Sequence, residues 1–189
     1  MQSRDREGAI VTLFNLPNLF TLARLVLTPF IAFDILHDRY SRAIILLFAA
    51  GFTDAIDGFL ARRLKTSTPA GAYFDPSADK ILLSVIYISL GIAGAMPWWM
   101  VAVVFGRDAL ILGMAAYGLL FTRLRKFPPS VWGKISTFFQ IAAALVVMGA
   151  RAGIASPVTL ALYLMVFGTI VSGLHYAWRA VVMLRETAH

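Results

Sequence analysis

The sequence predicts an all-α, polytopic membrane protein with six transmembrane helices and a short N-terminal interfacial helix. Of its 189 residues, 59% are hydrophobic, and the mean hydropathy is +0.76. Water-soluble domains of ordinary composition are much less apolar. The apolar residues also gather into six long runs, and about 20 apolar residues suffice for one helical span. We therefore expect a single membrane domain over residues 1–189.

The N-terminal segment, residues 1–17, is expected to lie along the membrane surface. Residues 1–8 are polar, and the apolar piece that follows, residues 9–14, is too short to cross a bilayer. No small-residue cleavage pattern follows a short apolar core, so we expect no cleaved signal peptide.

The six expected spans are apolar runs bounded by polar, charged or turn-forming residues. Pro29 predicts a kink in the first span. Trp98 and Trp99 predict an aromatic anchor at the interface before the fourth. The spans cover residues 18–36, 43–61, 71–91, 100–121, 131–148 and 156–178.

The net charge of +7 fits a membrane surface better than a nucleic acid, because the basic residues are dispersed at the ends of the apolar runs. We expect membrane lipids, and no nucleic acid, as partners. With six spans, 11 Lys and Arg residues fall on the side of the two termini and 3 on the other side. The positive-inside rule then places both termini in the cytoplasm.

Four aspartates stand out in a chain with only ten acidic residues. Asp54 and Asp57 are three positions apart and Asp75 and Asp79 four apart, so each pair shares one face of its helix. Acidic side chains in a membrane segment are costly and indicate a functional site. Carboxylate oxygens suit hard cations such as Mg²⁺ or Mn²⁺, and the chain has no cysteine for a thiolate site.

The aspartates belong to the pattern D-x2-D-G-x2-A-R-x8-G-x3-D-x3-D, which the sequence matches at every fixed position. This pattern resembles that of the CDP-alcohol phosphatidyltransferases. These enzymes transfer a phosphatidyl or similar group from a CDP-linked donor to an acceptor hydroxyl and release CMP. The resemblance implies that Asp54, Asp57, Asp75 and Asp79 hold the metal, as two ions, and that Asp79 is also the catalytic base.

The resemblance also implies a binding site for the CDP part of the donor. It assigns that role to positions of the motif that carry small or basic residues, together with the first aspartate. These positions are Asp54, Gly58, Ala61, Arg62 and Gly71.

Three basic residues outside the motif are candidates for the acceptor's phosphate. Arg24 either snorkels to a nearby interface or faces the polar pocket; its segment, N-L-P-N-L-F-T-L-A-R, resembles bacterial members of the family. Arg107 either pairs with Asp108 or Asp54, or binds the acceptor, and Lys134 either sits at the interface or binds the acceptor. Their strings, G-R-D and G-K-I-S-T-F-F-Q, resemble the phosphatidylglycerophosphate synthase and eukaryotic-type cardiolipin synthase branches.

The expected activity is phosphatidyl transfer from CDP-diacylglycerol to a phosphate-bearing alcohol, with glycerol 3-phosphate as the first choice. Cardiolipin synthesis from phosphatidylglycerol is the alternative, and a divalent-cation transporter is the alternative from another class. A transporter needs polar residues at several depths, whereas the acids here lie near one face. The resemblance further suggests a homodimer. We expect it in the bacterial inner (cytoplasmic) membrane, and the count of basic residues places the site on the cytoplasmic side.

Overall fold

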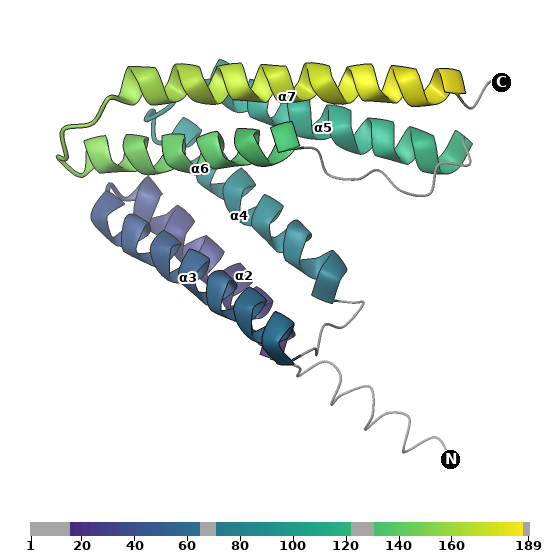
Figure 1. The fold of residues 1–189 in the computed structure, drawn as a ribbon. Coiled ribbons are helices and arrows are strands. Elements are labelled where there is room, and N and C mark those ends of the chain that lie inside the picture. The colour runs from purple at the N-terminus through teal and green to yellow at the C-terminus, as the bar shows by residue number, and fades with distance from the viewer. Residues whose placement is uncertain (1–15, 65–70, 122–130, 187–189) are drawn as a thin grey trace, which may run out of the picture. The chain divides into compact units, whose positions relative to one another are not determined.

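A computed structural model describes residues 16–64, 71–121 and 131–186. Within these ranges the chain forms six α-helices and no strand, which confirms the predicted all-α class (Figure 1). Within these ranges, side chains are not described at residues 16–21, 53–64, 71–77, 115, 119–121 and 183–186. The helices are α2 (Leu16–Leu36), α3 (Tyr40–Leu64), α4 (Gly71–Ile92), α5 (Trp98–Phe121), α6 (Val131–Arg151) and α7 (Val158–Glu186).

Each helix coincides with one predicted span, and the differences lie at the ends. Helix α5 begins at Trp98, two residues before the predicted start, because the Pro97 carbonyl accepts backbone hydrogen bonds from Met100 and Val101 (Figure 1). The last helix, α7, continues to Glu186, eight residues beyond the predicted end. The predicted interfacial segment lies outside the described residues, apart from Leu16 and Pro17, which begin α2.

The first compact unit, residues 1–93, is built around α2, which packs against both α3 and α4. Its core contains fully buried apolar side chains such as Ile31, Ile35 and Ile86. A tight turn joins α2 to α3. Asp38 adopts a positive φ of 58°, and Arg39 donates a backbone hydrogen bond to the Asp34 carbonyl over 2.8 Å.

The second compact unit, residues 94–189, consists of α5, α6 and α7, with α7 packed against both of the others. Polar side chains form part of the α6–α7 contact: Gln140 Nε2 donates to Thr169 Oγ1 over 3.3 Å, and Ser136 Oγ lies 3.5 Å from the same oxygen. Interhelical hydrogen bonds of this kind, together with close packing, stabilise helix pairs in membranes, where the hydrophobic effect does not drive association. The division into two units leaves the single-domain organisation a prediction.

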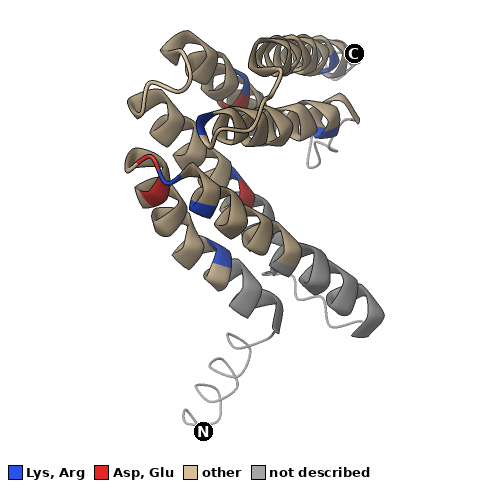
Figure 2. Cartoon of the chain, turned by 90° about the vertical axis from the view of Figure 1, so that its left-hand side faces the viewer, with Lys and Arg blue, Asp and Glu red and all other residues tan. Residues whose placement is uncertain are grey.

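Three helical segments are long and apolar enough to cross a membrane: Trp98–Gly118, Val131–Arg151 and Val158–Val182. Along α2 and α3, large apolar side chains such as Phe30 and Phe48 are also exposed. Figure 2 shows that charged residues occupy only short parts of the described helices. The chain is therefore an integral membrane protein, and the count of six spans stays a prediction.

Candidate functional site

The aspartate motif occupies the end of α3 and the start of α4. Asp54 and Asp57 lie in the last three turns of α3, and Asp75 and Asp79 lie in the first turns of α4. Both helices are continuous through these positions, so the helical backbone puts each pair on one helix face, as the sequence predicted. Six residues separate the two helices, and both helices pack against α2. The remaining motif residues lie on the same two helices: Gly58, Ala61 and Arg62 on α3, and Gly71 as the first residue of α4.

One described contact joins α2 to this motif. The Arg24 guanidinium, on α2, donates a hydrogen bond to the carboxylate of Asp79, on α4, and forms an ion pair with it. The Arg24 side chain is only 3% exposed, whereas that of Asp79 is 52% exposed. Thr28, one turn further along α2, donates its hydroxyl to the Arg24 carbonyl over 2.8 Å. Arg24 therefore turns inward toward the motif.

A second polar cluster surrounds Arg107 in the other unit. Its Nη1 lies 2.7 Å from Asp108 Oδ1, and its Nη2 donates to Ser172 Oγ, on α7, over 3.0 Å. Its guanidinium carbon lies 5.9 Å from the centre of the Tyr176 ring, within range of a cation–π interaction. The side chain is 9% exposed, and its Nε is buried without a hydrogen-bond partner in the described part of the chain.

The start of α6 closes against the Arg107 cluster at Gly133. A Cβ placed on Gly133 would lie 3.0 Å from Tyr176 Oη and 3.3 Å from Arg107 Nη2. The absence of a side chain is thus what allows α6 to approach this cluster. Lys134, the next residue, has an exposed side chain. Of the two alternatives for Arg107, the pairing with Asp108 is present, while a role toward an acceptor stays a prediction.

Sequence reasoning did not single out Ser172 or Tyr176, which position Arg107. Ser172 and Tyr176 are four residues apart on α7 and therefore lie on one face of this largely apolar helix. Thr169, which bonds to α6, belongs to the same stretch. The spacing of these polar residues was visible in the sequence. Nothing in the sequence showed that Arg107, on α5, would be their partner.

The candidate metal ligands of the motif fit a hard divalent cation. All four are carboxylates, and each pair is spaced to share one face of its helix. Among the side chains that the structure describes, no group of three His, Asp or Glu residues comes together. Three of the four aspartates, Asp54, Asp57 and Asp75, lie outside that set. The metal site therefore stays a prediction.

The sequence profile of the CDP-alcohol phosphatidyltransferases matches residues 14–184. The chain belongs to this family. The match covers all six described helices almost completely and confirms the resemblance that the aspartate pattern indicated. Members of the family transfer a phosphatidyl group from CDP-diacylglycerol, and they are generally dependent on a divalent metal. Membership identifies a transferase of phospholipid biosynthesis and argues against the cation transporter.

Similar proteins carry two kinds of name. A protein named "Probable phosphatidylglycerophosphate synthase" from Mycobacterium tuberculosis is 32% identical over 173 residues, which cover 88% of this chain and 81% of that protein. The CDP-diacylglycerol–glycerol-3-phosphate 3-phosphatidyltransferase of Aquifex aeolicus is 35% identical over 132 residues, 66% of this chain and 70% of its own. A Schizosaccharomyces pombe cardiolipin synthase (CMP-forming)/mitochondrial hydrolase fusion protein is 37% identical over 105 residues, 56% of this chain and only 18% of the fusion.

Proposed function

We propose that this protein is a phosphatidylglycerophosphate synthase, which transfers a phosphatidyl group from CDP-diacylglycerol to glycerol 3-phosphate and releases CMP. The complete aspartate motif, with the buried Arg24 turned toward Asp79, is the observation that carries the proposal. The Mycobacterium and Aquifex relatives, whose names state this activity, match 88% and 66% of the chain. Cardiolipin synthesis from phosphatidylglycerol is the second candidate, because the fission yeast relative is named for it.

The four aspartates would hold the family's divalent metal, as two Mg²⁺ or Mn²⁺ ions. Bound there, the ions would neutralise the diphosphate of the donor and stabilise the charge that develops on the transferred group. The chain's own part is to supply four carboxylates on two helix faces, Asp54 and Asp57 on α3 and Asp75 and Asp79 on α4.

The CDP part of the donor is proposed to lie along α3 and the first turn of α4. Gly58 and Ala61 give α3 a small surface, which lets a bulky nucleotide approach the helix backbone. Arg62 would bind donor phosphate with a planar, permanently charged guanidinium. Asp54, besides its metal role, and Gly71 complete this set.

Asp79 is proposed to accept the proton of the acceptor hydroxyl as that oxygen attacks phosphorus. Its side chain is half exposed, so an acceptor can reach it, while the ion pair with Arg24 restricts its orientation. Because Arg24 is buried, its charge is poorly screened by water and acts strongly on the anionic groups around Asp79. Arg24 thus has two proposed tasks, to position the base and to attract the acceptor's phosphate.

Arg107 and Lys134, in the second unit, are proposed as further ligands of the acceptor's phosphate. Arg107 is already oriented by Ser172 and Tyr176, which would hold its guanidinium in place for an anion. Lys134 follows Gly133, whose bare backbone lies against the same cluster, so both cations belong to one region of the second unit. A phosphate-bearing alcohol such as glycerol 3-phosphate would pair with such cations.

The proposed setting is a homodimer of single-domain subunits in the bacterial inner membrane, with six spans and both termini in the cytoplasm. The distribution of 11 against 3 basic residues supports this orientation. It would place the aspartate motif at the cytoplasmic face, where soluble glycerol 3-phosphate enters and CMP leaves.

The decisive experiment supplies each acceptor separately. Purified protein is incubated with CDP-diacylglycerol and Mg²⁺ or Mn²⁺, and CMP release is followed with glycerol 3-phosphate, with phosphatidylglycerol, or with water alone. Rapid release with glycerol 3-phosphate supports the first assignment, and release with phosphatidylglycerol alone replaces it by the second. Absence of acceptor-dependent release with both would refute the proposed function.

A further inference from the structure

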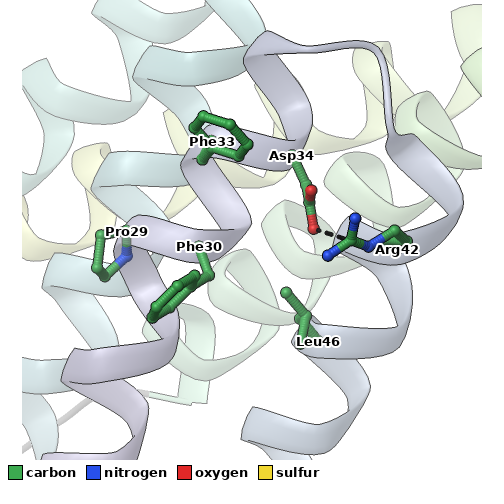
Figure 3. Close-up of a pocket in the computed structure, with 6 residues that line it drawn as sticks. All are labelled: Pro29, Phe30, Phe33, Asp34, Arg42 and Leu46. Atoms are coloured by element: carbon green, nitrogen blue, oxygen red, sulfur yellow. Dashed lines mark ion pairs between the residues drawn. The ribbon is translucent and has the colours of Figure 1, made fainter.

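A pocket of about 550 Å³ opens between α2 and α3, near the turn that joins them (Figure 3). It belongs to the first unit and lies at the opposite end of α3 from the aspartate motif. Arg42 is two residues after the start of α3, and Asp54 is twelve residues further along, about 18 Å at 1.5 Å per residue. The pocket is therefore distinct from the proposed catalytic site. It is lined by Pro29, Phe30, Phe33, Asp34, Arg42 and Leu46.

The polar end of the pocket holds two opposite charges whose pairing is incomplete. The Asp34 side chain is 2% exposed, and its Oδ2 lies 3.7 Å from Arg42 Nε, too far for a hydrogen bond. Its other oxygen, Oδ1, is buried and has no hydrogen-bond partner among the described residues. The Arg42 side chain is 65% exposed. Figure 3 shows the two groups pointing toward one another from the two helices.

A buried carboxylate oxygen without a donor is unfavourable, so this arrangement calls for a ligand. The neighbouring backbone does not supply the donor, because the turn uses the Asp34 carbonyl, and not its side chain, to accept from the Arg39 amide. His37 is likewise engaged elsewhere, with its Nδ1 2.8 Å from the Phe33 carbonyl and its ring stacked on Phe33. The described residues therefore offer the Asp34 carboxylate no hydrogen-bond donor, and a ligand with a cationic donor would supply one.

The other end of the pocket is apolar. Phe30 lies one helical turn before Asp34, and Leu46 lies one turn after Arg42, so both are about 6 Å further from the connecting turn than the charged pair. Phe30 is 56% exposed, which suits contact with an acyl chain. The order along the helices, from charged near the turn to apolar further in, matches the order from headgroup to acyl chain in a phospholipid.

We propose that this pocket binds a phospholipid whose headgroup carries a primary ammonium beside its phosphate. The ammonium pairs with the Asp34 carboxylate, the phosphate accepts from the Arg42 guanidinium, and the first part of an acyl chain lies against Phe30 and Leu46. A headgroup with both signs of charge is required because the pocket presents both. A glycerol headgroup leaves the buried carboxylate without a cation, and a choline headgroup has no N–H to donate.

This inference rests on the proposed membrane placement of α2 and α3 and is independent of the proposed catalytic roles. Because the chain has no cysteine, a single Ile45→Cys carrying a bimane group reports from beside the pocket without filling it. Ile45 is 66% exposed and is not among the lining residues. The labelled protein is placed in phosphatidylcholine nanodiscs that contain a small fraction of lipid with brominated acyl chains, which quench bimane on contact. The brominated lipid carries an ethanolamine, glycerol or choline headgroup, and no CDP donor is present.

The expected half-quenching fraction is roughly ten-fold lower for the ethanolamine lipid than for the choline lipid, the usual order for a charged hydrogen bond. Asp34→Asn removes this preference, and Arg42→Gln raises the half-quenching fraction of the ethanolamine lipid by a similar factor. Asp38→Asn, which removes an exposed carboxylate from the same turn, leaves it unchanged.

Equal quenching by the three lipids, or preference for the glycerol lipid, would overturn the proposal. So would an unaltered ethanolamine preference in Asp34→Asn. If that variant does not fold, Arg42→Gln decides, because its largely exposed side chain is dispensable for packing. Wild-type protein that selects the ethanolamine lipid but releases no CMP would remove the proposed function and leave this site standing. Protein that releases CMP in the acceptor assay but shows no lipid selectivity would refute this lipid site and leave the proposed function standing.

Discussion

The contact between α6 and the Arg107 cluster gives a prediction whose size follows from the structure. In Gly133→Ala, the new methyl group would lie 3.0 Å from Tyr176 Oη and 3.3 Å from Arg107 Nη2. Ordinary contacts begin near 3.4 Å, so the neighbours must move by a few tenths of an ångström. Nη2 also donates to Ser172 over 3.0 Å, and this hydrogen bond would be strained by the same movement.

Gly106→Ala is the matched control, since Gly106 precedes Arg107 on α5 and a Cβ there would meet nothing within 4 Å. Both substitutions gain about 0.5–1 kcal/mol from replacing a helical glycine. Only Gly133→Ala also bears the cost of overpacking, about 1–3 kcal/mol. The difference between the two variants therefore isolates the contact, and a chain of this size should show it as a melting temperature lower by several degrees.

The effect on activity should be confined to the acceptor. We expect the KM for glycerol 3-phosphate to rise about ten-fold in Gly133→Ala, equivalent to about 1.4 kcal/mol, while the dissociation constant of a CDP donor stays the same. Steady-state CMP release at varied acceptor concentration, with calorimetric titration of the donor, measures both. If Gly133→Ala and Gly106→Ala behave alike, the approach of α6 is not what shapes the acceptor site. An equal loss of donor and acceptor affinity would refute the assignment of this cluster to the acceptor.

Four further predictions concern the motif and the topology. CMP release should require a divalent cation, and full activity in excess EDTA would exclude the proposed metal dependence. Asp79→Asn should lower turnover by a factor of about 10² to 10⁴ with donor affinity nearly unchanged, whereas Asp57→Asn should weaken metal and donor binding together. Calorimetric titration with the donor measures the affinity of both variants. If both lose donor affinity equally, Asp79 is chiefly a metal ligand. Arg24→Gln removes an ion-pair partner of Asp79 and should reduce turnover. It should cost only about 1 kcal/mol of stability, because water can hydrate the half-exposed carboxylate of Asp79. Unchanged turnover would show that Arg24 does not position the base. Cysteines introduced at Lys65 and Gly94 should be labelled from opposite sides of the membrane, and labelling from one side would contradict the six-span topology.

The sequence alone determined the helical class, the positions of the six helices and the family. Long apolar runs and the residues that interrupt them are local properties of the chain, so the helices could be located to within a few residues at most ends. The aspartate motif was equally local, because helical periodicity already places Asp54 with Asp57 and Asp75 with Asp79 on single faces.

Only the tertiary structure decided which polar side chains meet. Arg24 and Asp79 are 55 positions apart and Arg107 and Ser172 are 65 apart, and no local pattern pairs them. Asp34, which sequence reasoning passed over, is buried beside Arg42 by the turn between α2 and α3. The physical reason lies in the solvent: in a membrane protein both the lipid-facing and the core-facing sides of a helix are apolar, so hydrophobicity does not reveal which face packs against which neighbour. The few polar side chains acquire their partners only when the helices pack.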